Sequence, residues 1–364
     1  MITNQVKLYS LGFQIAIESL KQCVADVTWA ANFSSFSGNI DSIPCGILNI
    51  PVSSNPLKPG NVRAYKLLKK HIEENNIDCI YCATPIGGLL GRLLGKNCKV
   101  KTVIYAAHGF LFFKGAGILN NTLYKLLEHL LARYTDALIT ITNEDYSSSL
   151  KMKVRGNKRY LIHGAGICVK DERPTPHLYL KEFGIPDDSF VLISGGFLNK
   201  NKNNKVIINA LSKLKNENIF YVICGDGEQR DNLMKLCKKR KVSDKVIFAG
   251  FRKDFPNLLK SSDCFVMPSY REGVPRSLLE AMNLGLPCIG SRTRGITDLI
   301  GTNGEGGLLC NPSNAAEFAN AIKTIHSDAF DRNAVSARNK LVAQDYSETV
   351  VRGELLCIFK ELLC

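Results

Sequence analysis

The sequence predicts an α/β fold made of two doubly wound parallel sheets in tandem. Short β-branched apolar runs alternate with amphipathic helical patterns, which is typical of parallel strands joined by crossover helices. The alternation stops at a charged, proline-rich segment, 171–188, and then restarts. The length of 364 residues suits two domains of roughly 150 residues each.

In the first half, the clearest helix spans 122–134 and carries a row of leucines on one face. These are Leu123, Leu126, Leu127, Leu130 and Leu131. The expected strands of this half are 27–31, 45–50, 79–83, 102–107, 137–142 and 159–163. A doubly wound domain usually opens with a buried apolar strand, but only 6–12 is available here. We therefore expect the first strand to be short, displaced or missing.

In the second half, expected strands at 190–195, 220–225, 245–250 and 264–269 alternate with helices, and an amphipathic helix ends the chain. Ligands of such sheets bind at the carboxyl ends of the strands, so the two domains are expected to face a central cleft. The expected organisation is an N-terminal acceptor-side domain, a linker, a nucleotide-sugar-binding domain and a terminal helix that packs back on the N-terminal domain. Their boundaries are 1–170, 171–188, 189–340 and 341–364.

The composition is basic, with 47 Lys and Arg against 33 acidic residues and a net charge of +14. Such a charge favours a polyanionic partner: nucleic acid, anionic membrane or a phosphorylated ligand. No module with interleaved aromatic and basic residues is visible, so nucleic acid is not expected. The basic residues of the first half fall in two short groups, which are either solvated helix faces or a membrane-facing patch. They are Lys66, Lys69, Lys70, Arg92, Lys96, Lys99 and Lys101.

The start of the chain, MITNQVKLYS, has no apolar core typical of a signal peptide, and no stretch approaches the ~20 apolar residues that span a bilayer. We expect a cytoplasmic protein with a peripheral contact on the inner face of the cytoplasmic membrane. Cys264, Cys288 and Cys310 lie in apolar runs and are expected to be small buried hydrophobic residues.

The strongest functional signal is REGVPRSLLEAMNLG at 271–285. Pro275 is favourable in a first helical turn and Gly285 after a last one, so the helix is expected to begin just after Glu272. Free N–H groups of Gly273, Val274 and Arg276 would then point at an anion. Glu272 and Glu280 would lie ~12 Å apart on a full helix, which suits two sets of hydroxyl groups flanking a diphosphate.

Two further segments complete this pattern. Gly196 opens a strand-to-helix loop, GGFLNKNKNN, in which Lys202 is the candidate cation for the phosphates. CGDGE at 224–228 ends a strand, and Gly225 and Gly227 allow a backbone to approach a ligand closely.

In this order, these segments resemble the donor site of the retaining family 4 glycosyltransferases, which have the GT-B fold. The resemblance implies that Glu272 holds the transferred sugar, Glu280 the nucleotide ribose and Lys202 the donor phosphates. It also places backbone near Phe251 and Arg252 at the base, and the loop with Arg294 and Gly295 beside the sugar. The family's usual phosphate-binding arginine is replaced here by Phe197.

In the first half, 83–93, 105–115 and 143–146 resemble family members that build polysaccharides. The resemblance implies a sugar or acceptor contact by His108 and Gly109, and it makes Lys202, Glu272 and His108 the candidate catalytic residues. It further implies a hexosyltransferase that takes a nucleotide-diphospho-sugar, first of all a UDP-sugar. The acceptor would be a glycan, lipid-linked or free, in capsule, O-antigen or exopolysaccharide synthesis.

Asp-x-Asp, the usual metal-binding pair of metal-dependent glycosyltransferases, does not occur in the sequence, so neither a metal nor another cofactor is expected. Two alternatives stay open: a sugar-nucleotide epimerase or phosphorylase on the same fold, and a non-catalytic regulatory protein that binds sugar nucleotides. The residues do not specify the donor sugar, the acceptor, the linkage or the oligomeric state.

Overall fold

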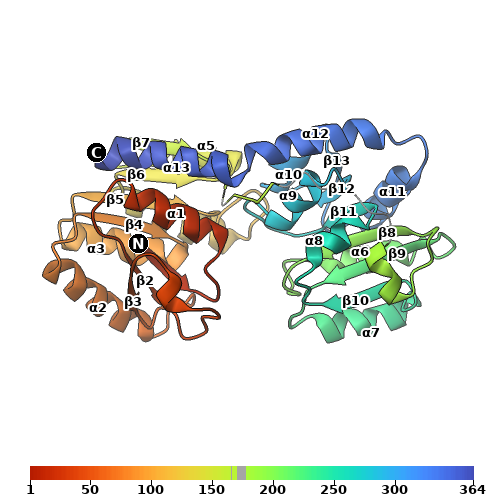
Figure 1. Cartoon of the computed structure of the whole chain (residues 1–364), viewed down its shortest axis with the longest axis horizontal. Coiled ribbons are helices and arrows are strands. Elements are labelled where there is room, and N and C mark those ends of the chain that lie inside the picture. The colour runs from red at the N-terminus through yellow and green to blue at the C-terminus, as the bar shows by residue number, and fades with distance from the viewer. Residues whose placement is uncertain (165, 170–177) are drawn as a thin grey trace. The chain divides into compact units, whose positions relative to one another are not determined.

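A computed structural model describes residues 1–164, 166–169 and 178–364 of the chain. Contacts divide it into two compact units: Met1–Gly166 with Glu348–Cys364, and Ile167–Ser347. Each unit is a parallel sheet with helices on its faces (Figure 1). The predicted pair of Rossmann-like α/β domains is therefore confirmed.

The sheet of the first unit has the strand order β3-β2-β1-β4-β5-β6-β7, and every neighbouring pair is parallel. Its strands are β1 (Ile2–Gln5), β2 (Thr28–Asn32), β3 (Gly46–Asn49), β4 (Cys79–Ala83), β5 (Thr102–Ala107), β6 (Ala137–Thr140) and β7 (Lys158–Leu161). Strand order reverses between β1 and β4, which is the switch point at which such sheets bind ligands.

The first strand is present, but at Ile2–Gln5 and not within 6–12, where the sequence seemed to offer its one candidate. Its polar residues misled the prediction because their side chains are satisfied inside the fold. Thr3 is fully buried and its hydroxyl accepts a hydrogen bond from the indole N–H of Trp29 at 2.9 Å. Asn4 accepts one from the Thr84 hydroxyl at 2.8 Å. Buried polar groups are tolerated when they are paired in this way.

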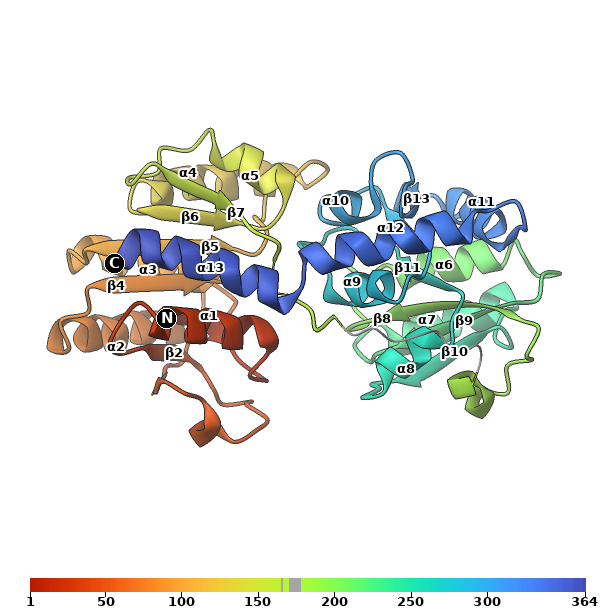
Figure 2. The same cartoon turned by 45° about the horizontal axis from the view of Figure 1, so that its top comes forward.

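Helix α13 belongs to the first unit by its contacts, although it ends the chain. It lies against α1, where Arg352 forms an ion pair with Glu18, and Phe359 meets the Tyr81 ring edge-on at 5.4 Å (Figure 2). The helices of this unit are α1 (Leu11–Lys21), η1 (Ile40–Ser42), α2 (Gly60–Glu74), α3 (Pro85–Asn97), η2 (Asn120–Tyr124), α4 (Lys125–Ala132), α5 (Asn143–Ser149) and α13 (Glu348–Leu363).

The structure decides the orientation of one helix and overturns one expectation about the first half. The leucines of the 122–134 helix mostly face solvent, because Leu123, Leu126 and Leu130 are exposed and Leu131 alone among the five is buried. Arg92 is not a surface cation, because it is 1% exposed and its guanidinium donates to Glu128 at 2.7 Å. An apolar periodicity shows which residues share a helix face but not whether that face is covered.

The sheet of the second unit repeats the arrangement with the order β10-β9-β8-β11-β12-β13, again all parallel. Its strands are β8 (Phe190–Gly195), β9 (Ile219–Cys224), β10 (Val246–Gly250), β11 (Cys264–Met267), β12 (Cys288–Ser291) and β13 (Gly307–Cys310). Its helices are η3 (Leu178–Phe183), α6 (Asn204–Leu211), α7 (Arg230–Arg240), α8 (Phe255–Lys260), α9 (Arg276–Asn283), α10 (Ile296–Ile300), α11 (Ala315–His326) and α12 (Arg332–Asp345).

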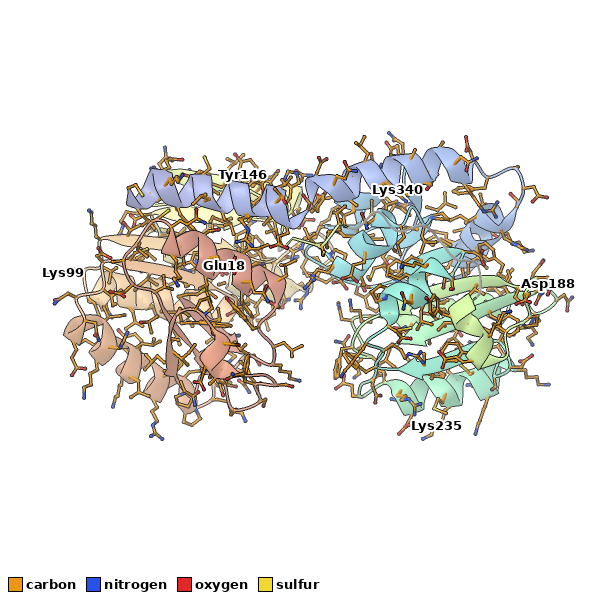
Figure 3. All side chains as sticks on the ribbon, in the orientation of Figure 1. Glu18, Lys99, Tyr146, Asp188, Lys235 and Lys340 are labelled. Carbon is orange, nitrogen blue, oxygen red and sulfur yellow. The ribbon has the colours of Figure 1, made fainter. Side chains whose placement is uncertain are left out.

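Two apolar layers enclose this second sheet, one against α6 and α11 and the other against α8, α9 and α10. Cys264, Cys288 and Cys310 are buried in them, as predicted. The expected linker 171–188 lies partly outside the described residues; within its described part, Leu180 is fully buried in the second layer. Charged side chains such as Lys99 and Lys235 extend outward from their units (Figure 3). In the described part of the chain, no helix is long and apolar enough to cross a bilayer.

Candidate functional site

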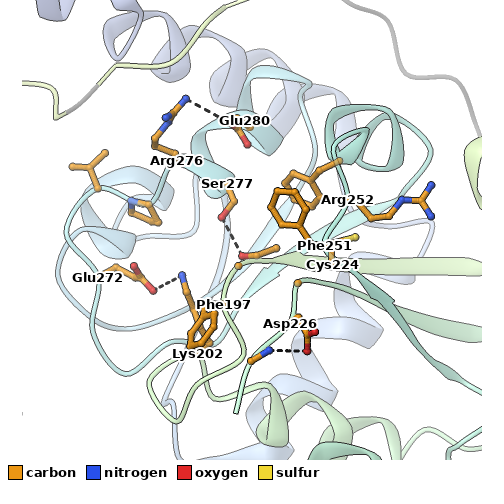
Figure 4. A pocket seen from close by; sticks show the side chains of 17 residues that line it. Phe197, Lys202, Cys224, Asp226, Phe251, Arg252, Glu272, Arg276, Ser277 and Glu280 are labelled. Atoms are coloured by element: carbon orange, nitrogen blue, oxygen red, sulfur yellow. Dashed lines mark hydrogen bonds and ion pairs between the residues drawn. The ribbon is translucent and has the colours of Figure 1, made fainter. Parts of the chain in front are cut away.

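A pocket of about 1290 Å³ in the second unit lies at the carboxyl ends of β8 and β9 (Figure 4). Strand order reverses between β8 and β11, so this is the position at which doubly wound sheets bind ligands. Four segments form its wall: 195–202, 224–227, 251–255 and 272–280.

Two glycines bring the loops after β8 and β9 into direct backbone contact. Gly225 has φ +145°, and a Cβ there would lie 1.9 Å from the Gly196 carbonyl oxygen. Gly196 has φ +137°, and its N–H donates to the Cys224 carbonyl at 2.9 Å. Both conformations strain any residue with a side chain. The sequence predicted that Gly225 and Gly227 let the backbone approach a ligand closely. In the structure both glycines approach the backbone of the loop after β8, at Gly196 and Leu198, and this contact fixes the pocket floor.

Lys202 and Glu272 form the charged pair of the pocket. The Lys202 ammonium donates to the Glu272 carboxylate at 2.9 Å, and both side chains are largely buried. The two residues are 70 positions apart and meet because β8 and β11 are adjacent strands. A cation held by a carboxylate at the edge of a cavity can shift to an incoming anion while the carboxylate accepts hydroxyl groups.

The loop that presents Lys202 is held by asparagines that were not predicted as site residues. Asn199 accepts from the Lys202 backbone N–H at 3.0 Å, and Asn201 donates to the Arg271 carbonyl at 2.8 Å. Asn203 adopts a left-handed conformation and donates to the carbonyls of Pro268 and Pro312. Three asparagines within five residues before a helix were a usable signal, because asparagine both tolerates φ > 0 and bonds nearby backbone.

Helix α9 begins later than the sequence suggested. Its first residue is Arg276, and Pro275 is the N-cap with an extended backbone and without a side-chain cap hydrogen bond. Gly273 and Val274 therefore precede the helix. The N–H groups of Leu278 and Leu279 bond to the Pro275 carbonyl, so those of Arg276 and Ser277 are the ones that helix geometry leaves without an intrahelical partner, and both residues line the pocket. This uncapped helix start gives the wall a partial positive charge.

Glu280 lies one turn into α9, on the same face as Arg276, with 4.0 Å between its carboxylate and the Arg276 guanidinium. Burial raises the pKa of Glu280, and the nearby Arg276 charge opposes that rise. Glu272 and Glu280 thus stand in different parts of one pocket, each beside its own cation (Figure 4).

Two phenylalanines that line the pocket are exposed: Phe251 is 77% exposed, and Phe197, which lies beside Lys202, is 59% exposed (Figure 4). The neighbouring Arg252 guanidinium extends away from Lys202 and Glu272 (Figure 4), where it donates to Asp254 at 2.7 Å and to Glu182 at 2.6 Å. These bonds hold the pKa of Arg252 above its usual range. They also attach the loop that presents Phe251 to Glu182. The Arg252 side chain therefore supports the pocket wall. The exposed rings of Phe251 and Phe197 border the pocket.

Arg294 and Gly295 do not line this pocket. Gly295 supports it instead, because its backbone lies against Gly273 so closely that a Cβ would be 1.5 Å from the Gly273 carbonyl oxygen. Arg294 is 6% exposed.

His108 and Gly109 lie in the first unit, directly after β5. His108 borders a separate, mostly apolar cavity of about 220 Å³ together with Phe13, Thr84 and Leu355. Thr84 has φ 71° and ψ 154°, a conformation that costs a non-glycine residue roughly 1–3 kcal/mol. Such strain next to a cavity marks Thr84 as a residue of interest that the sequence did not reveal.

In the described residues, no three His, Cys, Asp or Glu side chains gather closely enough to hold a metal ion. Burial raises the pKa of Cys224, the thiol on the pocket wall, to about 12, so it is neutral at physiological pH.

Two tandem Rossmann-like units of this kind define the GT-B class of proteins. The second unit matches the family model "Glycosyl transferases group 1" over 178–342, and the first matches "Glycosyl transferase 4-like" over 8–143. The chain is 35% identical to the glycosyltransferase EpsD of Bacillus subtilis over 85% of its own length and 84% of the relative's. It therefore belongs to the GT-B glycosyltransferases.

A second relative is 30% identical to this chain, over 77% of this chain's length and 74% of the relative's length. It is the Escherichia coli UDP-Gal:alpha-D-GlcNAc-diphosphoundecaprenol alpha-1,3-galactosyltransferase. Among solved structures, Anabaena HepE in complex with UDP and glucose has a TM-score of 0.77 at 18% identity, with 99% of each chain covered. The lipopolysaccharide glycosyltransferase WaaG has a TM-score of 0.74 at 17% identity, with 99% of each chain covered. These two structures show the same fold.

Proposed function

We propose that the chain transfers a hexose from a nucleotide-diphospho-sugar to a growing glycan in polysaccharide biosynthesis, with retention of configuration. The observation that carries the proposal is a single pocket, at the switch point of its sheet, that contains both the Lys202–Glu272 pair and the Arg276–Glu280 pair. Cations for a diphosphate lie beside carboxylates for the hydroxyl groups on either side of it. UDP is the first candidate nucleotide, since HepE was solved with UDP and the Escherichia coli relative is named for UDP-Gal.

In the proposed reaction, the acceptor hydroxyl oxygen forms a bond to the anomeric carbon while the bond from that carbon to the diphosphate breaks. The electron pair leaves with the diphosphate, and the hydroxyl proton passes to the departing phosphate oxygen. Lys202 and the first turn of α9 stabilise the charge that develops on that oxygen. Glu272 orients the sugar, Glu280 accepts from the ribose, and Phe251 borders the base.

We propose a glycan acceptor linked to a lipid diphosphate. The Escherichia coli relative is named for such an acceptor, and the net charge of +14 suits a peripheral contact with the anionic inner face of the cytoplasmic membrane. His108 and Gly109 would contact sugar or acceptor. The proposed chemistry needs no metal, because fixed positive groups neutralise the diphosphate.

The proposal is tested by incubating the purified protein with UDP-galactose, UDP-glucose or UDP-N-acetylglucosamine and GlcNAc-diphosphoundecaprenol, with and without excess EDTA. We expect one UDP-sugar to give a glycosylated lipid and an equal amount of UDP, at the same rate in EDTA. Consumption of the donor without a glycosylated product would favour the epimerase or phosphorylase alternative. A requirement for added manganese or magnesium would contradict the metal-independent mechanism.

Glu280 makes UDP binding depend on pH under this proposal. An ionised carboxylate is the better acceptor for ribose hydroxyls, and burial raises the pKa of Glu280. The affinity for UDP should therefore fall as the pH is lowered from neutrality, before ordinary glutamates become protonated. Glu280→Gln should bind UDP about tenfold more weakly at neutral pH, and its affinity should vary less steeply with pH, because only the terminal phosphate of UDP, which titrates near pH ~6, then contributes. Calorimetric titration of both proteins across pH checks this, and parallel pH profiles would contradict the role of Glu280.

A further inference from the structure

A row of large aliphatic side chains on η2 and α4 faces solvent. Leu119, Leu123, Leu126 and Leu130 follow one another at spacings of four, three and four residues, which places them on one helix face. They are 63%, 54%, 59% and 45% exposed, and the adjacent Ile118 is 85% exposed. We call these five residues the leucine stripe. A contiguous exposed apolar face of this kind usually marks an interaction site.

A buried ion pair on the opposite face keeps the leucine stripe outward. Glu128 accepts from Arg92 at 2.7 Å, and the Arg92 guanidinium lies 3.9 Å from the centre of the Tyr105 ring. Leu131 and Ala132 are buried on that same inner side. Turning the helix to cover the leucines would expose Leu131 and separate Glu128 from a guanidinium that is itself 1% exposed, which is strongly unfavourable. The outward orientation is thus built into the fold.

The charges around the leucine stripe are positive. Between 109 and 134 the chain has the cations Lys114, Lys125 and Arg133, all exposed, and a single acidic residue, Glu128. Glu128 is neutralised by Arg92. The Glu144 carboxylate, from α5, accepts a hydrogen bond from the Lys114 backbone N–H at 2.6 Å and is the acidic neighbour of these cations. The solvent side of this segment therefore combines aliphatic side chains with an excess of positive charge.

We propose that the leucine stripe docks this glycosyltransferase on an anionic lipid bilayer, with the stripe inserted among the upper acyl chains and the three cations at the headgroups. A basic helix with an apolar face lies in a membrane interface in this way. A protein partner fits less well, because interface hot spots are rich in Trp, Tyr and Arg and poor in Leu. The proposal rests on the membrane contact proposed above and assigns it a surface.

The basic group on α2 is a weaker candidate for that contact. Lys69 and Lys70 form ion pairs at 3.6 Å with Glu73 and Glu74, one turn further along the helix. Their charges are therefore partly compensated, and no row of exposed leucines accompanies them on α2. Reversing them should affect vesicle binding less than changing the leucine stripe.

Co-sedimentation tests the proposal. The full chain is mixed with vesicles of phosphatidylethanolamine and phosphatidylglycerol, or with vesicles of phosphatidylcholine alone. We expect binding to the anionic vesicles, and at least about a tenfold weaker partition for Leu123→Gln/Leu126→Gln. The matched control is Leu57→Gln/Leu341→Gln, since those two leucines are 89% and 65% exposed outside the stripe and should not matter.

Insertion itself can be observed by fluorescence. The chain has one tryptophan, Trp29, which is fully buried and gives a constant background. Leu126→Trp adds a reporter on the stripe, whose emission should shift to the blue with anionic vesicles, whereas Leu341→Trp should not respond. UDP binding, measured in parallel, should be unchanged in all these variants because none lies in the donor pocket.

Equal vesicle binding by the wild type and Leu123→Gln/Leu126→Gln would overturn the proposal. So would a stripe-dependent dimer in the absence of vesicle binding, because it would make the stripe an interface between copies of this chain. Loss of UDP binding in the wild type would count against the proposed function instead, so the two failures are distinguishable.

Discussion

Lys202→Ala is expected to lower kcat/KM by at least about 30-fold, or ~2 kcal/mol of transition-state stabilisation. Lys202 is the cation in direct contact with Glu272, at 2.9 Å, and the proposed mechanism gives it the developing charge on the departing diphosphate. Initial rates with the identified UDP-sugar and acceptor measure the effect. The matched control is Lys205→Ala, three residues further on, which is exposed and should leave the rate unchanged.

The same substitution leaves a largely buried carboxylate without its partner, and this second effect must be separated from the first. In Lys202→Ala/Glu272→Gln the stranded charge is gone but the cation is still missing. We expect activity to stay low in the double variant, with a melting temperature close to that of the wild type. Recovery of activity in the double variant would show that Lys202 acts only by neutralising Glu272.

Arg92→Met should cost about 3 kcal/mol of unfolding free energy in the first unit, because it leaves the Glu128 carboxylate near Tyr105 without a compensating charge. A two-unit chain need not unfold in one step, so a probe confined to the first unit is required. The buried Trp29 provides it, and its fluorescence during urea unfolding gives the free energy.

The control for Arg92 is Arg155→Met. Arg155 also pairs with a carboxylate, Asp136, but its side chain is 39% exposed, so the loss should stay below about 1 kcal/mol. The double variant Arg92→Met/Glu128→Gln should regain most of the stability, since no unpaired buried charge remains. Equal costs for Arg92→Met and Arg155→Met would contradict the account of α4, and with it the reason for the outward leucine stripe.

Much of the fold follows from local pattern. Buried parallel strands are continuous apolar runs, so 79–83 and 102–107 were predicted at the residues where β4 and β5 lie. The first strand was misplaced because Thr3 and Asn4 look polar in isolation. Their hydrogen-bond partners, Trp29 and Thr84, come from distant parts of the chain.

The composition of the pocket was also readable, but its internal contacts were not. Glu272, Glu280, Lys202 and the glycines were selected by residue type, spacing and their place after strands. The order of the strands decides that Lys202 contacts Glu272 and that Gly225 abuts Gly196. It also decides that the Arg252 side chain points away from Lys202 and Glu272.

The sequence by itself thus determined two doubly wound α/β units and many residues of the pocket in the second unit, because strand runs, helix periodicity and glycine turns are local properties. Tertiary structure alone decided which helix faces are covered. In α4 the buried Arg92–Glu128 pair, between residues 36 positions apart, turns Leu123, Leu126 and Leu130 toward solvent. The free energy of burying a charge exceeds that of covering a few leucines, and no local pattern records that competition.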